Sequence, residues 1–438
     1  MFALTNITRD YAWGSATAIA QLLGTVPSGG PEAELWMGAH PDSPSVAATP
    51  EGPVPLDQLI AEHPLETLGA DVHAAFGAKL PFLTKLLAAD QALSLQVHPT
   101  LERARERFAA EETAGVPRDA AHRNYKDANH KPEMILALTP FEALCGFRPC
   151  AEGAALFRAV TAAIAASGAE IPPLLQQVEM TLNSRMAAPM VVRRAFETLV
   201  GGGAETTALV ELAAEALAAA VPTDTDVSSD ADLGLGLDSA GLPDNAAASL
   251  RTVVELARQY PGDAGVLVSL LLNRVSLLPG DAIYLPAGNI HAYLNGLGLE
   301  VMASSDNVLR GGLTGKHVDV PELLDTVDFN PSAVPVVPTR TTVLGQQVWE
   351  PPFAEFTLQR VDMSAGSGPV PLVQNGPLLV LSVAGSVLLD SPRSDMVLSR
   401  GESIFVPAAE NPVMVHPHAV AGDANGDPAV VFAITVAS

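Results

Sequence analysis

One stretch, GDAIYLPAGNIHAYLN at residues 280–295, constrains the fold of this 438-residue chain more than any other. Five of its positions have a fixed spacing, namely Gly280, Pro286, Gly288, His291 and Asn295. Proline and glycine at these places predict a strand pair of a small antiparallel β-barrel, because they turn the chain between strands. The turn directs His291 to the barrel interior, so we interpret this spacing as a metal-binding motif of such a barrel.

A later segment repeats the start of this motif. GESIFVP at residues 401–407 shares a turn glycine, an acidic residue, a strand and a proline with GDAIYLP at residues 280–286. The repetition predicts a second β-barrel near the C-terminus. Only the first barrel has an obvious metal site.

Three further residues are candidate metal ligands. Gln96 and His98 lie two apart in the probable strand SLQVHP, so both side chains can point to one face. Glu133 opens the apolar run EMILAL, where a buried carboxylate needs a partner or a metal. With His291 they form an oxygen and nitrogen ligand set that suits zinc, although ligand type alone also permits iron or manganese.

The charge of the chain argues against nucleic acid and anionic membranes as partners. The formal net charge is −25, so most of the surface repels polyanions. An anionic substrate therefore needs a local cluster of cations. The chain has only five lysines, and four of them lie in or beside the motifs discussed below: Lys85, Lys126, Lys131 and Lys316.

The chain carries no sign of an oxidising compartment. Its two cysteines, Cys145 and Cys150, form no disulfide framework and no zinc site. The N-terminal segment lacks the pattern of a signal peptide, and no apolar stretch predicts a membrane span. We therefore expect a cytoplasmic protein.

The pattern of residue types divides the chain into β-rich and helical parts. Residues 1–149 contain short apolar runs broken by Gly, Pro and Asp, which predict strands with a few short helices. Residues 151–260 carry Ala, Leu and Glu at helical spacing and predict a helical insertion. Within it, the acidic stretch 223–245 predicts a surface loop. Strand-like patterns resume after Gly262 and continue to the C-terminus.

Several stretches, in this order, resemble the type I phosphomannose isomerase family: YAWGS, AELWMGAHPDSPS, LPFLTKLL, LSLQVHP, NHKPEM, FEALCGFRP, GNIHAYL and SSDNVLRGGLTGKHVDVPELLDTVDF. The resemblance covers most of the N-terminal and middle regions. It implies one zinc ion per chain, with its ligands on Gln96, His98, Glu133 and His291. One departure is Thr100, which follows QVHP where the family usually has Asp or Asn.

The resemblance also implies a mainly β fold with helices. It predicts a catalytic cupin (jelly-roll) barrel, a helical domain inserted in it, and a C-terminal cupin-like barrel without metal. The predicted boundaries are residues 1–150 and 263–330 for the two parts of the catalytic barrel, 151–262 for the insertion and 331–438 for the C-terminal barrel. The implied activity is interconversion of mannose 6-phosphate and fructose 6-phosphate through an enediol.

Aldose–ketose isomerisation needs a proton-transferring group and a stabiliser of negative charge. Arg310 is our first choice for stabilising the enediolate, because a guanidinium stays charged and offers fixed donors. Lys131, which shares a face with Glu133, is a candidate acid/base, and Asp306 is the alternative. His130 and Glu300 are candidates for supporting contacts only.

The remaining site predictions concern substrate binding. Lys126 and Lys316 are candidates for binding the phosphate, and Ser94, on the face of Gln96 and His98, is another. Trp13 and Tyr293 could line the sugar pocket, although aromatic residues in β-barrels more often belong to the core.

Two alternatives stay open. A non-catalytic sugar-phosphate-binding cupin protein would keep the barrel and the metal without turnover, but loss of Arg310 or Lys131 would favour it and both are present. A cupin oxygenase would need redox-active iron on a His-rich ligand set. The resemblance implies a role in the supply of activated mannose (GDP-mannose) or in mannose catabolism. We expect a monomer or a weak homo-oligomer.

Overall fold

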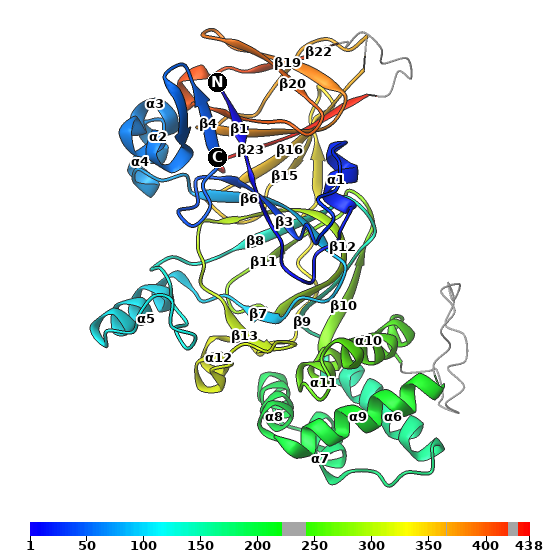
Figure 1. Cartoon of the computed structure of the whole chain (residues 1–438). Helices are drawn as coiled ribbons and strands as arrows, with labels where there is room; N and C mark the ends of the chain where they lie inside the picture. The colour runs from blue at the N-terminus through cyan, green and yellow to red at the C-terminus, as the bar shows by residue number, and fades with distance from the viewer. Residues whose placement is uncertain (221–241, 365, 419–427) are drawn as a thin grey trace.

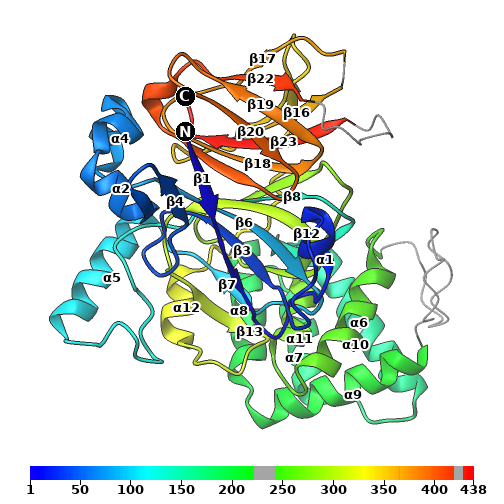
Figure 2. The ribbon, with the colours of Figure 1, turned by 45° about the horizontal axis from the view of Figure 1, so that its top comes forward.

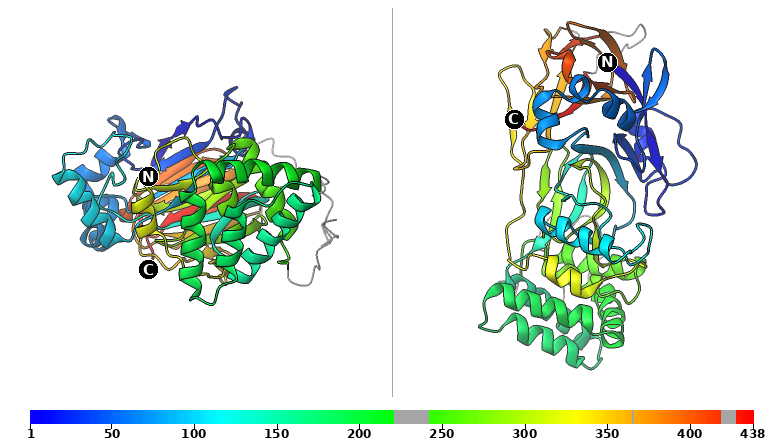
Figure 3. Two further views of the ribbon diagram at one scale, coloured as in Figure 1. Left: turned by 90° about the horizontal axis from the view of Figure 1, so that it is seen from below. Right: turned by 90° about the vertical axis from the view of Figure 1, so that its left-hand side faces the viewer.

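The computed structural model describes residues 1–220, 242–364, 366–418 and 428–438. These residues form three regions in a row: a β-rich region with both termini, a central β-rich region, and a helical region at the opposite end (Figures 1 and 3). The acidic loop predicted at residues 223–245 lies outside the described residues as far as position 241.

The central region is a ten-stranded antiparallel sheet organised around the long strand β12, His291–Ala303. Four strands pair with β12, and they bring distant parts of the sequence to it. These four are β6 (Phe82–Ala89), β7 (Leu95–Val97), β8 (Glu133–Ala137) and β9 (Phe141–Phe147). The other five are β2 (Ile7–Arg9), β3 (Glu34–Gly38), β10 (Leu272–Leu277), β11 (Ala282–Leu285) and β13 (Leu309–Gly312).

Strands β3, β6 and β8 are buried along their whole length, so any charged residue within them lies in the protein interior. Their apolar side chains pack into the cores on either face of the sheet. This arrangement makes each acid or lysine in these strands energetically costly unless another charge or a metal compensates it.

The helical region interrupts the central sheet between β9 and β10, which are themselves paired. It consists of α6 (Cys150–Ala166), α7 (Pro173–Leu182), α8 (Ala188–Gly201), α9 (Ala204–Ala220) and α10 (Ala246–Gln259). A short return through α11 (Gly265–Val268) and the 3₁₀ turn Ser269–Leu271 leads to β10. The predicted helical insertion in a mainly β chain is confirmed, while the domain boundaries stay predictions.

The β-rich region at the other end contains two sheets. The nine-stranded sheet has the order β14 (Thr339–Thr341), β15 (Gln347–Trp349), β16 (Thr357–Met363), β23 (Ala429–Thr435), β18 (Leu378–Ala384), β21 (Ser403–Val406), β1 (Phe2–Thr5), β4 (Val46–Thr49) and β5 (Gly52–Pro55). The four-stranded sheet has the order β17 (Val370–Pro371), β22 (Met414–Pro417), β19 (Ser386–Asp390) and β20 (Asp395–Ser399).

One part of this sheet differs from the division made from the sequence. Residues 1–150 were assigned to the catalytic barrel, but β1 pairs with β21 and carries β4 and β5 with it into the C-terminal sheet (Figure 2). A four-residue strand such as β1 shows only an alternation of faces, which contains no information about its partner. The start of the chain therefore extends the C-terminal sheet beyond β21, through β1 and β4 to β5.

Short helices surround the two β-rich regions: α1 (Ala18–Leu23), α2 (Leu56–Glu62), α3 (Pro64–Leu68), α4 (Ala70–Phe76), α5 (Leu101–Thr113), α12 (Val320–Thr326) and the 3₁₀ turn Ala408–Glu410. Thr100 is the N-cap of α5, and its hydroxyl accepts the Arg103 backbone N–H at 3.2 Å. Asp, Asn and Thr all serve this role, so the departure at Thr100 preserves the cap. Among the described helices, none is both long and apolar enough to span a membrane.

Candidate metal centre and active site

Three predicted site residues lie in one row across neighbouring strands. His291, the first residue of β12, is opposite Gln96 on β7, and Gln96 is in turn opposite Arg310 on β13. Residues directly opposite each other in an antiparallel sheet point to the same face. The three side chains therefore share one face, with Gln96 in the middle and Arg310 two strand spacings, about 10 Å, from His291.

Two more residues complete a buried cluster on that face. His98 Nε2 lies 3.3 Å from Glu133 Oε1, and His291 Nε2 lies 3.4 Å from Glu133 Oε2. One potential ligand atom from each of the three residues lies within 4.8 Å of the others. All three side chains are at most 4% exposed.

Backbone carbonyls orient both imidazole rings. His98 Nδ1 donates its hydrogen to the Asn307 carbonyl at 2.8 Å, and His291 Nδ1 donates to the Asn289 carbonyl at 3.0 Å. Each ring then has its lone pair on Nε2, the atom that faces Glu133. His98 Nε2 is buried and has no hydrogen-bond partner among the described residues. Such an arrangement of Nδ1–H bonds is typical of metal-binding histidines.

The charges in the cluster favour metal-binding protonation states. Burial lowers the pKa of His98 to about 4, against the opposing effect of Glu133, so this ring is neutral at pH 7. Burial alone would raise the pKa of Glu133, but the Lys131 ammonium and the two histidines hold it well below its usual range. Lys131 Nζ lies 2.9 Å from Glu133 Oε1.

These donors fit a zinc ion. Two neutral imidazole nitrogens and a carboxylate are ligands that zinc prefers, and the orphaned His98 Nε2 requires an electron-pair acceptor. Gln96 lines the same small cavity of about 50 Å³ as Glu133, Lys131 and His291, where its side chain could supply a fourth donor.

A buried ion network lies next to the cluster. Lys85 on β6 is opposite Glu300 on β12, and its Nζ lies 3.0 Å from Glu300 and 3.7 Å from Glu34. Burial opposes the charge of Lys85, but these two carboxylates outweigh it and raise its pKa. Tyr293 also lines the small cavity, and burial raises the pKa of its hydroxyl, which has no hydrogen-bond partner among the described residues.

The cations Arg310, Lys126 and Lys316 form a second group. Burial lowers the pKa of Lys316, and the charges of Arg310 and Lys126 lower it further. Burial also lowers the pKa of Arg310. None of the three side chains forms an ion pair with a described residue, so the group has uncompensated positive charge. This is the local cationic cluster that an anionic substrate requires in an acidic protein.

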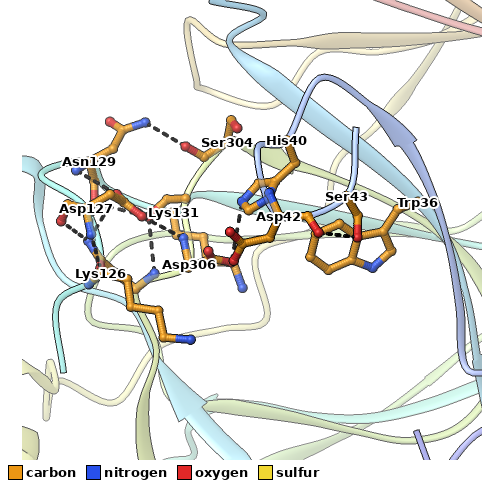
Figure 4. A network of polar contacts seen from close by, with 12 residues as sticks. Trp36, His40, Asp42, Ser43, Lys126, Asp127, Asn129, Lys131, Ser304 and Asp306 are labelled. Atoms are coloured by element: carbon orange, nitrogen blue, oxygen red, sulfur yellow. Dashed lines mark hydrogen bonds and ion pairs between the residues drawn. The ribbon is translucent and has the colours of Figure 1, made fainter. Parts of the chain in front are cut away.

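The loop 126–129 is tied to the site through the buried residue Asn307. Its Oδ1 accepts the Lys126 N–H at 2.8 Å, and its Nδ2 donates to the carbonyls of Asp127 and Asn129 at 2.7 and 2.8 Å. Asp127 accepts the Asp306 N–H at 2.8 Å, which links the loop to the neighbouring segment (Figure 4). Because Asn307 also accepts from His98, one residue joins this loop to the metal cluster.

Asp306 lies in different surroundings from Lys131. Its carboxylate faces His40 Nε2 at 3.4 Å (Figure 4). It also lies 3.6 Å from the guanidinium of Arg118. It lines a larger cavity, of about 690 Å³, together with His130, whose Nε2 lies 2.5 Å from Glu355. The metal cluster and Lys131 do not line that cavity, and Asp306 does not line the small cavity of the metal cluster.

Two predicted substrate-binding residues, Ser94 and Trp13, lie outside the small cavity of the metal cluster. Ser94 precedes β7 and is half-buried, and its hydroxyl makes no hydrogen bond with the described residues. Trp13 stacks on Tyr11, with ring centroids 5.7 Å apart, and packs against the apolar cluster that contains Tyr293. Neither lines the small cavity of the metal cluster.

Three residues of the site, Lys85, Glu34 and Asn307, were not among the site residues predicted from the sequence. Lys85 and Glu34 were detectable as charged residues inside apolar runs, LPFLTKLL and AELWMG. Asn307 offered no such signal, because an asparagine in a Gly- and Ser-rich segment is typical of a turn.

Comparison with known proteins gives a consistent result. The family model for the catalytic domain of type I phosphomannose isomerase matches residues 1–150. Mannose-6-phosphate isomerase of Salmonella typhimurium is 37% identical over 94% of this chain and 96% of its own length. The human mannose-6-phosphate isomerase is 32% identical over 94% of both chains.

Solved structures agree over the whole chain. A mannose 6-phosphate isomerase bound with zinc and yttrium has a TM-score of 0.81 and 33% identity, with all of both chains covered. A Salmonella typhimurium mannose 6-phosphate isomerase bound to fructose 6-phosphate and zinc has the same TM-score, identity and coverage. The predicted fold class is therefore confirmed. This chain belongs to the type I phosphomannose isomerase family.

Proposed function

We propose that this chain is a zinc-dependent isomerase that interconverts mannose 6-phosphate and fructose 6-phosphate. The observation that carries the proposal is the position of a buried metal-binding cluster beside a group of cations that have no ion-pair partner among the described residues. His98, Glu133 and His291 supply the cluster, while Arg310 and Lys316 belong to the cations. The names of its relatives and the substrate-bound structure support the same activity.

In this proposal Gln96, His98, Glu133 and His291 hold one zinc ion per chain. Zinc bound there supplies Lewis-acid stabilisation of negative charge that develops on a substrate oxygen. The backbone carbonyls that fix the two rings keep both Nε2 atoms directed into the site before metal arrives. Pre-orientation of this kind lowers the cost of assembling the site.

The isomerisation moves a proton between C1 and C2 of the open-chain sugar through an enediol. We assign the proton transfer to Lys131 or Asp306. Lys131 is 8% exposed and bonded to Glu133, so it lies directly beside the metal cluster. Asp306, which faces His40 and Arg118 and lines the larger cavity, is the alternative.

The cations have separate roles in this proposal. Arg310, in line with Gln96 and His291, stabilises the enediolate, because its guanidinium remains charged in a partly buried position. Lys126 and Lys316 bind the phosphate, which would pair with charges that are otherwise uncompensated.

Three further contacts complete the assignment of substrate-binding residues. Tyr293 lines the site from the buried strand β12, which supports a contact with the sugar. Ser94 and Trp13 retain their predicted roles, near the phosphate and the sugar respectively. Their positions flank the strands that hold Gln96 and Tyr293.

The domain division, the location, the oligomeric state and the metabolic role are also part of this proposal. We propose the domain division given above, with β1, β4 and β5 completing the C-terminal sheet. We further propose a cytoplasmic monomer or weak homo-oligomer that supplies fructose 6-phosphate or the precursor of GDP-mannose.

The proposal is tested by removing the metal and restoring it. Purified protein is stripped with a chelator, and conversion of mannose 6-phosphate to fructose 6-phosphate is followed before and after zinc is added back. We expect activity to vanish with the metal, to return with zinc, and to be absent in His291→Ala. Stoichiometric zinc without conversion would instead favour a non-catalytic sugar-phosphate-binding protein.

A further inference from the structure

The segment that carries Arg310 and Lys316 has an unusual backbone. β13 contains a register shift between Arg310 and Gly312, which marks a bulge. The next residue, Leu313, has a φ of +53°, the left-handed region that residues with a side chain rarely occupy. It is the only non-glycine residue with positive φ among those that the structure describes. Such a conformation persists only where the surroundings hold it in place.

A single carboxylate holds this turn. Asp263 Oδ1 accepts the Leu313 N–H at 2.9 Å, and Oδ2 accepts the Thr314 N–H at 3.3 Å. The Thr314 hydroxyl then accepts the Lys316 backbone N–H at 3.1 Å, so the contact continues to the backbone of Lys316. The Gly265 N–H donates to Asp263 Oδ1 at 2.7 Å, which fixes the carboxylate itself.

The packing at this contact is tight. A Cβ added to Gly312 would meet Asp263 Oδ1 at 2.9 Å. A Cβ added to Gly265 would meet the backbone nitrogen of Leu313 at 2.9 Å. Residues 263–265, which directly follow the helical insertion, therefore lie against the turn that follows Arg310.

The last residues of the helical insertion also contact the segment that leads to the strand of Gln96. Gln259 Oε1 accepts the Ala92 N–H at 2.9 Å, and the Tyr260 hydroxyl donates to the Ala92 carbonyl at 2.6 Å. Ala92 leads into β7, the neighbour of β13 in the sheet. Residues 259–263 thus contact the segment before β7 and the turn after β13, two adjacent strands of the site.

We propose that Asp263 is a positioning residue that holds Arg310 and Lys316 in the geometry needed to bind and turn over the sugar phosphate. This assignment rests on the proposed function and gives a role in it to the segment that leads from the helical insertion back to the central sheet. Asp263 does not contact the metal cluster or the cations directly, and it acts through the backbone of Leu313 and Thr314. Its removal should therefore affect substrate kinetics without affecting zinc.

The test compares Asp263→Ala with Asp263→Asn in the full-length zinc protein. We expect Asp263→Ala to raise KM for mannose 6-phosphate about tenfold and to lower kcat, because the cations lose their alignment. Zinc affinity, measured by chelator competition, should stay within about twofold of wild type. Asp263→Asn keeps the Oδ1 acceptor and should restore most of the lost kcat/KM.

Two additional variants make the result specific. Asp281 accepts the Leu278 N–H at 2.9 Å in a turn away from the cations, so Asp281→Ala is the matched control and should leave KM unchanged. In a Lys316→Ala background, Asp263→Ala should raise KM by less than about threefold, because the two residues act through one contact. If Asp263→Ala does not fold, Gly265→Ala disturbs the same turn and should raise KM in the same way.

The possible outcomes separate this inference from the proposed function. A wild-type protein that fails to convert mannose 6-phosphate overturns the proposed function. A wild-type protein that is active, with KM unchanged in Asp263→Ala or Gly265→Ala, overturns only the role of Asp263. Equal losses of zinc affinity and of kcat/KM would also overturn it, since they would show a general effect on the site.

Discussion

Removal of the Asn307 side chain should destabilise the protein and weaken zinc binding at the same time. Asn307 is fully buried, and three of its hydrogen bonds to the backbone of residues 126–129 are 2.7–2.8 Å long. A net hydrogen bond contributes about 1 kcal/mol, and each backbone group left buried without a partner adds to the loss. For Asn307→Ala we expect a decrease of about 3–5 kcal/mol in the free energy of unfolding of the metal-free protein.

The effect on zinc follows from the backbone of the same residue. The Asn307 carbonyl holds the Nδ1–H of His98, so a shift of this segment disturbs the orientation of a metal ligand. Loss of such a supporting contact typically costs about 10- to 100-fold in metal affinity. Denaturant unfolding of the metal-free protein and chelator competition of the zinc protein measure the two effects separately.

A control residue distinguishes this role from an ordinary loss of hydrogen bonds. Asn375 donates to the Val436 carbonyl at 3.1 Å in the C-terminal region. Asn375→Ala should decrease stability by about 1 kcal/mol and leave zinc affinity unchanged. The reasoning is refuted if Asn307→Ala loses less than about 1 kcal/mol or binds zinc as tightly as wild type does.

Three further predictions follow from the buried charges. Lys85→Met leaves Glu300 buried without its partner and should decrease the free energy of unfolding, measured by denaturant titration, by about 3–5 kcal/mol. Adding Glu300→Gln to this variant should recover part of the loss. The folded-state pKa of His98 lies below the unfolded value, so the free energy of unfolding of the metal-free protein should decrease by about 3 kcal/mol as the pH falls from about 6.5 to 4. The decrease over the same pH range should be smaller in His98→Gln. Lys126→Ala should raise KM for mannose 6-phosphate about tenfold with zinc content unchanged; an unchanged KM would contradict its role as a phosphate ligand.

The sequence contains enough information to predict the metal cluster because each of its residues carries a local signal. The spacing around His291 indicates a turn, and the alternation of faces pairs Gln96 with His98. Glu133 begins a strand that is otherwise apolar, so its burial was predictable. The structure brings His98, Glu133 and His291 within 4.8 Å of one another, as these signals require.

The parts that could not be predicted depend on contacts between distant residues. The alternation along β1 does not indicate that its partner is β21, about four hundred residues later in the chain. Asp306 lies in the same sequence motif as Arg310, but its neighbours in space, His40 and Arg118, come from other segments of the chain. Asn307 donates hydrogen bonds to and accepts them from a loop backbone, and Asp263 accepts them from a turn; no periodicity in the sequence reveals such a role.

The distribution of charge explains how an acidic protein can select an anionic substrate. The buried network has three carboxylates, Glu34, Glu133 and Glu300, against the two ammonium groups of Lys85 and Lys131. The interior therefore has an excess of carboxylate, which favours a bound divalent cation. The cations beyond Gln96 have no carboxylate partners among the described residues and favour a phosphate. A sugar phosphate that reaches from the metal cluster to these cations can bind to both, whereas an inorganic anion or a neutral sugar binds to only one of them. The arrangement therefore selects for a molecule that carries both a sugar and a phosphate.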